Sequence, residues 1–289
     1  MESSAQRVGE YVEAQADVIR QGDRLGDDAP DAVHQARVAC RRLRSSLATF
    51  DALWGRRHRR LRRDLRWWGG LLGLPRDLEV TRERLLGLVE AHELEGLAEV
   101  AARIRRRLDQ ERADALAGVR AAVGSERFEA LQAQVEALRT RPGWRPLAQA
   151  PAPLVLPVLV ARPARAAGRL RADLPEGPGR AEVVHRIRKR AKAARYGYEA
   201  AGETEPATAW KRVTETLGGT QDAVVAQGWL TRLQEEARRA GEPLSGYRWL
   251  LAEVRRRGAE DERTGLMWLD AALAQVKCRP LYPDGRVAP

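Results

Sequence analysis

Residues 33–44 read Val-His-Gln-Ala-Arg-Val-Ala-Cys-Arg-Arg-Leu-Arg. Four residues that can carry positive charge stand at offsets of 0, 3, 7 and 10: His34, Arg37, Arg41 and Arg44. On an α-helix these four lie within an arc of roughly 80°. The apolar residues lie on a different face: Val33, Ala36, Cys40, Leu43, Leu47 and Phe50. The stretch therefore predicts an amphipathic helix with one cationic face and one core face.

The same pattern occurs again 151 residues later, in residues 184–195. The offsets are kept by His185, Arg188, Lys192 and Arg195. The apolar face also recurs, in Val184, Ile187, Ala191, Ala194 and Tyr198. One such helix is ordinary, but two with the same face indicate an internal duplication.

A second landmark follows each cationic helix. Residues 72–77 and 217–222 share the pattern Leu-Gly-x-x-x-Asp. Glycine at both sites, with proline at the first, predicts that one helix ends there and the next begins. We expect Asp77 and Asp222 to cap these next helices or, as the alternative, to orient an arginine or histidine of the cationic helix.

The composition predicts an all-α protein, because Ala, Leu, Arg and Glu dominate and β-branched runs are scarce. The net charge is +11, and the excess is present in both halves, with 27 cations against 23 acids up to residue 150 and 24 against 17 after it. Such a protein is expected to bind a polyanion such as nucleic acid, an acidic membrane or a phosphate polymer. Two cysteines exclude a disulfide framework, and no metal-ligand spacing or bound cofactor is predicted.

The pattern of helices and breaks predicts two halves, 1–150 and 151–289, each with four or five helices and short connections. A proline-rich stretch, 141–157, is expected to link them. Neither a signal peptide nor a membrane-spanning segment is predicted, which favours a cytoplasmic protein.

Further cations are weaker candidates. Arg165 and Arg169, with Arg162, share a face of a helix expected near 154–174 and could face the same site. The basic run 56–63 is by default the solvated start of a helix. We expect His34 and His185 either to donate to phosphate or to be held by a neighbouring carboxylate such as Asp77 or Asp222.

In the two cationic helices and the two Gly…Asp stretches the sequence resembles the CHAD domain, the conserved histidine α-helical domain. The matching stretches are 33–50, 71–85, 185–199 and 217–225, and the resemblance spans nearly the whole chain. No Glu-x-Glu-x-Lys signature of a fused triphosphatase domain is present, so the chain is similar to a stand-alone member.

This resemblance implies two four-helix bundles related by a pseudo-twofold axis, with basic faces lining a central cavity or pore. It also implies non-enzymatic binding of inorganic polyphosphate and association with polyphosphate granules. From the spacing of the two cationic faces, brought together by this symmetry, the ligand-binding residues are expected to be His34, Arg37, Arg41, Arg44, His185, Arg188, Lys192 and Arg195, with Arg165 and Arg169 as further candidates and Asp77 and Asp222 in support.

Two other functions remain open from the residues alone. A helical phosphotransfer protein also places a histidine beside basic residues, with His34 as the phosphate acceptor here. A nucleic-acid-binding protein fits the net charge, although no stacking aromatic residues alternate with the cationic face. No pairing of nucleophile and base, phosphate-binding loop or acidic pair indicates an enzyme.

Overall fold

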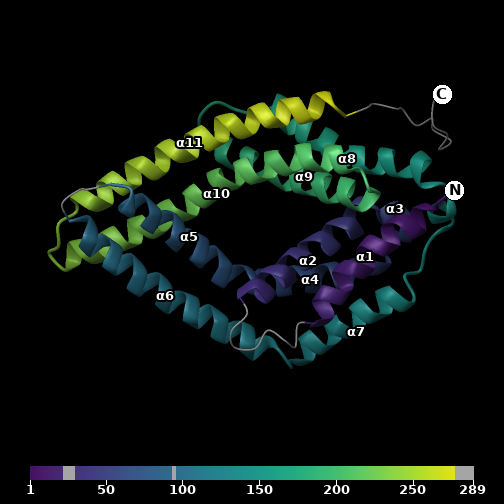
Figure 1. Cartoon of the computed structure of the whole chain (residues 1–289), viewed down its shortest axis with the longest axis horizontal. Helices are drawn as coiled ribbons and strands as arrows, with labels where there is room; N and C mark the ends of the chain where they lie inside the picture. The colour runs from purple at the N-terminus through teal and green to yellow at the C-terminus, as the bar shows by residue number, and fades with distance from the viewer. Residues whose placement is uncertain (22–29, 93–95, 277–289) are drawn as a thin grey trace.

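The computed structural model describes residues 1–21, 30–92 and 96–276, and it confirms an all-α protein (Figure 1). The helices before residue 150 are α1 (Ser4–Arg20), α2 (Pro30–Thr49), α3 (Asp51–Trp54), η2 (Gly55–His58), α4 (Arg59–Leu71), α5 (Gly73–Glu90), α6 (Leu97–Ala122), α7 (Glu126–Thr140) and η3 (Pro146–Gln149). Those after it are α8 (Ala152–Ala172), α9 (Arg180–Ala201), α10 (Thr204–Arg239) and α11 (Ser245–Ala274). None of the described helices combines the length and the apolar character that crossing a membrane requires.

Local sequence sets several helix ends. Ser3 and Gln6 form a capping box at the start of α1, in which each side chain accepts from the other residue's backbone N–H. Ser125 caps α7 with its side chain, which accepts from the backbone N–H of Phe128. The cationic helix α9 ends at Gly202, whose φ of 77° is a left-handed conformation that favours glycine.

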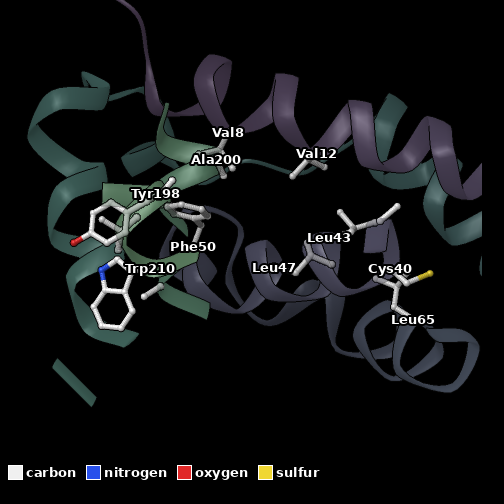
Figure 2. Close-up of a cluster of buried hydrophobic side chains, with 14 of the residues drawn as sticks. Val8, Val12, Cys40, Leu43, Leu47, Phe50, Leu65, Tyr198, Ala200 and Trp210 are labelled. Carbon is white, nitrogen blue, oxygen red and sulfur yellow. The ribbon is translucent and has the colours of Figure 1, made fainter. Parts of the chain in front are cut away.

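The larger buried core lies where α1, α2, α4, α7, α8 and α9 pack with the first part of α10 and the end of α11. Figure 2 shows part of it, with Val8 and Val12 of α1 facing the apolar side of α2. Leu43, Leu47 and Phe50 of that side are at most 1% exposed, as the apolar spacing of the stretch predicts. The core face of α2 thereby fixes the direction of its cationic face.

A smaller core lies at the opposite end of the elongated molecule, where α5 and α6 pack against the far ends of α10 and α11 (Figure 1). Leu85, Ile104, Leu230 and Leu250 are fully buried there. Both cores combine helices from before and after residue 150. The boundary between the two predicted halves therefore does not separate the two cores.

The expected break at residues 217–222 is wrong, because α10 runs without interruption for 36 residues through this stretch. The expected break at residues 72–77 is confirmed, since α4 ends at Leu71 and α5 begins at Gly73 with Pro75 in its first turn. In α10 the glycines have a packing role instead. A Cβ on Gly219 would overlap the Asp261 carboxylate of α11, so this glycine leaves room for that side chain.

The predicted linker is not an extended spacer. It contains η3, and its backbone holds the start of the chain: Ser4 N donates to Ala150 O at 2.9 Å, and Ala152 N donates to Glu2 O at 3.0 Å. The N-terminal end of α1 is thereby tied to the start of α8.

Replacing Gly265 of α11 by alanine is expected to destabilise the fold by about 1–2 kcal/mol. A Cβ there would lie 2.5 Å from Leu217 Cδ2 and 3.2 Å from the Leu217 backbone nitrogen, and this overpacking exceeds the helix-propensity gain of roughly 1 kcal/mol. Gly228 in α10 is the matched control, because a Cβ there meets nothing within 4 Å and Gly228→Ala should stabilise. Urea unfolding of both variants measures the difference. Equal effects of the two substitutions would contradict the close contact of α10 with α11.

Candidate anion-binding site

The two cationic helices, 151 residues apart in sequence, meet at their charged faces. Burial, followed by the positive charges of Arg188, Arg41 and Arg37, lowers the pKa of Lys192 to about 6. Burial also lowers the pKa of Arg188 and of Arg37, with Arg41 acting on both in the same direction. α2 and α9 thus place four cations close enough to repel one another: Arg37, Arg41, Arg188 and Lys192.

The Gly…Asp stretch of α5 lies against the cation of the first repeat. A Cβ on Gly73 would lie 3.4 Å from Arg37 Nε, and Arg37 Nη2 donates to Asp77 Oδ1 at 2.6 Å. Gly73 therefore leaves the guanidinium room to lie along the start of α5. This geometry assigns Asp77 an orienting role.

The equivalent stretch of α10 lies against the cation of the second repeat. A Cβ on Gly218 would lie 3.7 Å from Arg188 Nη2, and Asp222 is the charge that most favours the Arg188 guanidinium. Burial raises the pKa of Asp222, which Arg188 and Arg84 oppose. In both repeats a glycine and an aspartate thus lie near the arginine, as a direct ion pair for Arg37 and Asp77 and as an electrostatic neighbour for Arg188 and Asp222.

The capping expectation for both aspartates is wrong. Asp77 lies beyond the first turn of α5, whose N-cap Leu72 makes no side-chain cap, and Asp222 lies inside α10. The alternative, that these aspartates orient arginines of the cationic helices, agrees with the Arg37–Asp77 ion pair.

Arg84 is a member of the site that sequence reasoning missed. Its guanidinium donates to Gly219 O at 3.0 Å and lies 3.4 Å from Asp261 Oδ2, so it braces α5 against α10 and α11. The available signal was its position seven residues after Asp77, on the same face of α5.

A groove of about 320 Å³ continues from this cluster between α2 and α4. Its lining includes Arg37, Arg41 and Arg44 of α2, and Arg66 of α4. Burial lowers the pKa of Arg44, and the next causes are the positive charges of Arg66 and Arg41. Gly70 also lines the groove, and a Cβ added to it would meet no atom within 4 Å. Sequence reasoning missed Arg66, which lies just beyond the basic run 56–63.

Arg195, the last cation of the second cationic face, lies outside the cluster. Its Nε donates to Glu199 Oε1 at 2.9 Å, and its guanidinium lies over the Tyr196 ring. Glu199 also pairs with Arg42 of α2 at 3.1 Å and accepts from the Tyr11 hydroxyl at 2.9 Å. Arg195 therefore belongs to a contact that joins α1, α2 and α9.

The two histidines differ in their surroundings. His185 Nδ1 lies 2.6 Å from Gln221 Oε1, so an amide oxygen stands where a carboxylate of Asp77 or Asp222 was expected. His34 is exposed on α2. Neither histidine is among the main charged neighbours of Lys192 or Arg188.

The cations of α8 are not brought into the cluster. Arg162 pairs with Asp51 at 3.6 Å, and Arg165 is a charged neighbour of the Tyr198 hydroxyl. Arg169 is exposed. Within the described ranges, no three His, Cys, Asp or Glu side chains gather as a metal ion would require.

Lys192→Met is expected to stabilise the protein without ligand. The folded pKa of about 6 lies below the unfolded value of about 10.5, so the folded state binds fewer protons between these pH values. Stability should therefore rise with pH across this window in the wild type. The variant should gain on the order of 1 kcal/mol or more near pH 7 and lose that advantage towards pH 10. Thermal melts of the wild type and the variant from pH 6 to 10 measure this difference in stability. A difference in melting temperature that does not change with pH would contradict the lowered pKa of Lys192.

Comparisons with known proteins show the family and the fold of the chain. The CHAD domain family model matches residues 10–231, and the chain belongs to this family. Uncharacterized proteins of Mycobacterium tuberculosis strains CDC 1551 / Oshkosh and ATCC 25618 / H37Rv are each 32% identical over 262 residues, which is 86% of this chain. The chain spans about half the length of these relatives, 50% in each case.

Two solved structures have a similar fold. PptA from Streptomyces chartreusis is 20% identical, with a TM-score of 0.77 over 95% of this chain and 100% of that chain. The CHAD domain from the plant Ricinus communis is 23% identical, with a TM-score of 0.72 over 96% of this chain and 93% of that chain.

Proposed function

We propose that this protein binds inorganic polyphosphate, without catalysing a reaction on it, at the facing cationic sides of α2 and α9. The observation that carries the proposal is the cluster of four basic side chains, Arg37, Arg41, Arg188 and Lys192, of which the three arginines are charged near pH 7. Their main neighbouring carboxylates are Asp77 and Asp222, too few to balance the charge. Burial and, after it, repulsion by the arginines lower the pKa of Lys192, and a polyanion would relieve the repulsion.

The chemistry of the donors supports a phosphate ligand. Arginine offers a planar set of N–H groups that can bind two oxygens at once, and polyphosphate presents only oxygen acceptors. Arg188 Nε is buried and has no hydrogen-bond partner among the described residues. A buried donor without a partner is costly, and a phosphate oxygen would satisfy it.

The groove between α2 and α4 supports a linear ligand. It carries the cationic surface from Arg37 and Arg41 to Arg44 and Arg66, so successive phosphates of one chain could follow it. Arg195, Arg165 and Arg169 lie away from this path and are proposed to contribute less than the sequence alone predicts.

We also infer that the site lies on the pseudo-twofold axis of a duplicated bundle and lines a central cavity. Support comes from the shared arrangement of Arg37, Gly73 and Asp77 in one repeat and of Arg188, Gly218 and Asp222 in the other. A polyphosphate-binding protein of this kind is expected in the cytoplasm, at polyphosphate granules.

The test is a titration with long-chain polyphosphate, DNA and RNA at matched phosphate concentration across a salt series. We expect polyphosphate to bind at least about tenfold more tightly than either nucleic acid at 150 mM salt. The buried arginine N–H groups donate to phosphate oxygens, which a polyphosphate chain presents without attached sugars and bases. Equal binding of all three polyanions would favour the nucleic-acid function. Acid-labile phosphate on His34 after incubation with a phosphodonor would favour the phosphotransfer function.

A further inference from the structure

The carboxylate of Glu199 joins the two cationic helices to each other and to α1. Its Oε1 accepts a hydrogen bond from Arg195 Nε of α9 at 2.9 Å. Its Oε2 pairs with Arg42 Nε of α2 at 3.1 Å and accepts from the Tyr11 hydroxyl of α1 at 2.9 Å. Both carboxylate oxygens therefore have partners, and the two ion pairs link the helices that carry the cationic faces.

This contact is largely enclosed by protein. The side chains of Glu199 and Arg195 are each 18% exposed, and that of Arg42 is 32% exposed. The Tyr196 ring lies beside both guanidinium groups, with its centroid 5.5 Å from Arg195 Cζ and 5.9 Å from Arg42 Cζ. Solvent and salt screen such ion pairs less than exposed ones, so they hold a fixed geometry between the helices.

The contact lies close to the clustered cations along both helices. Glu199 follows Lys192 by seven residues on α9, which is about 10 Å along the helix axis, and Arg42 directly follows Arg41 on α2. By its charge alone, a carboxylate in this position opposes the binding of an anion. A role in setting the distance between the two helices explains why a carboxylate stands there.

We propose that Glu199 is a positioning residue, which holds α2 and α9 at the spacing that lets one polyanion contact both cationic faces. The inference rests on the proposed function and adds to it a residue that does not touch the ligand. Arg42 and Arg195 provide one ion pair from each helix. A binding site needs such supporting contacts, because a displaced donor loses its hydrogen bond to the ligand.

Glu199→Gln tests the inference through the direction of its effect. The substitution removes a negative charge, so electrostatics alone predicts tighter binding of polyphosphate. It also weakens both ion pairs and lets α2 and α9 shift, so a positioning role predicts weaker binding. In a titration of the full chain with long-chain polyphosphate at 150 mM salt, we expect the affinity to fall about tenfold.

Two variants serve as controls. Glu235→Gln removes the same charge from an exposed carboxylate that pairs with Arg238 and Arg239, so the affinity should stay within about twofold. Tyr11→Phe removes one hydrogen bond of Glu199 and keeps both ion pairs. It should lower the melting temperature while the affinity again stays within about twofold, which separates positioning from stability.

Glu199→Asp keeps the charge but is one methylene shorter, so its carboxylate cannot keep both ion pairs, and we expect a severalfold loss of affinity. Circular dichroism verifies the fold of each variant. If Glu199→Gln does not fold, an unchanged affinity of Glu199→Asp overturns the inference.

The remaining outcomes separate the inference from the proposed function. If wild-type protein binds polyphosphate and Glu199→Gln binds it equally or more tightly, the inference fails and the proposed function stands. Equal weakening by Tyr11→Phe and Glu199→Gln also overturns the inference, because stability alone would then explain the loss. Wild-type protein that does not bind polyphosphate overturns both.

Discussion

Saturating polyphosphate should raise the melting temperature of this protein by about 10 °C. In the folded protein without ligand, burial and then mutual repulsion lower the pKa values of Arg188 and Lys192, and a polyanion removes that repulsion only in the folded state. Ligand at about 1,000 times its dissociation constant adds about 4 kcal/mol of stability, and each kcal/mol raises the melting temperature by about 2–4 °C in a domain of this size class.

Thermal scanning with a series of polyphosphate concentrations measures this stabilisation. Orthophosphate at the same total phosphate is the control, because it screens charge without linking the cations of α2 and α9 through one molecule. An unchanged melting temperature at saturating polyphosphate would contradict the proposed function, as would an equal rise with orthophosphate.

Replacing Arg37, Arg41 and Arg188 together by glutamine should weaken polyphosphate binding by at least about 100-fold. Each charge-assisted hydrogen bond contributes about 1.5–3 kcal/mol, and the three arginines lie in one cluster. The measurement is calorimetry or fluorescence titration at 150 mM salt, with far-ultraviolet circular dichroism to verify the fold.

The matched control removes the same net charge from the outer surface. Arg238, Arg239 and Arg256 pair with Glu235 and Glu253 and are exposed, so Arg238→Gln/Arg239→Gln/Arg256→Gln should change the affinity by no more than about threefold. Equal losses in the two triple variants would mean that overall charge, and not the cluster, binds the ligand.

The sequence predicted the parts of the fold that depend on local patterns. The apolar spacing of Leu43, Leu47 and Phe50 specified which side of α2 is buried, and the cationic face follows from it. The stop at Gly73 and Pro75 was also predicted, because both residues act within their own turn.

The sequence did not predict features that depend on a distant partner. Gly218 and Gly219 resembled a helix end, yet Gly219 makes room for Asp261 of α11 inside one long helix. Arg195 fits the spacing of the cationic face of α9. Its guanidinium instead donates a hydrogen bond to Glu199, one turn further along the same helix. Arg84 and Arg66 do not belong to the duplicated pattern of the cationic helices. The packing of α5 brings Arg84 to the site, and the packing of α4 brings Arg66 there.

We propose above all that α2 and α9 bind one and the same polyanion. Calorimetric titration with tripolyphosphate tests it most directly, because this ligand is too short to link separate sites. We expect one tripolyphosphate to bind per protein, with Arg37→Gln and Arg188→Gln each weakening that single site and leaving the stoichiometry at one. Two tripolyphosphates per protein, with each substitution abolishing only one of them, would contradict it.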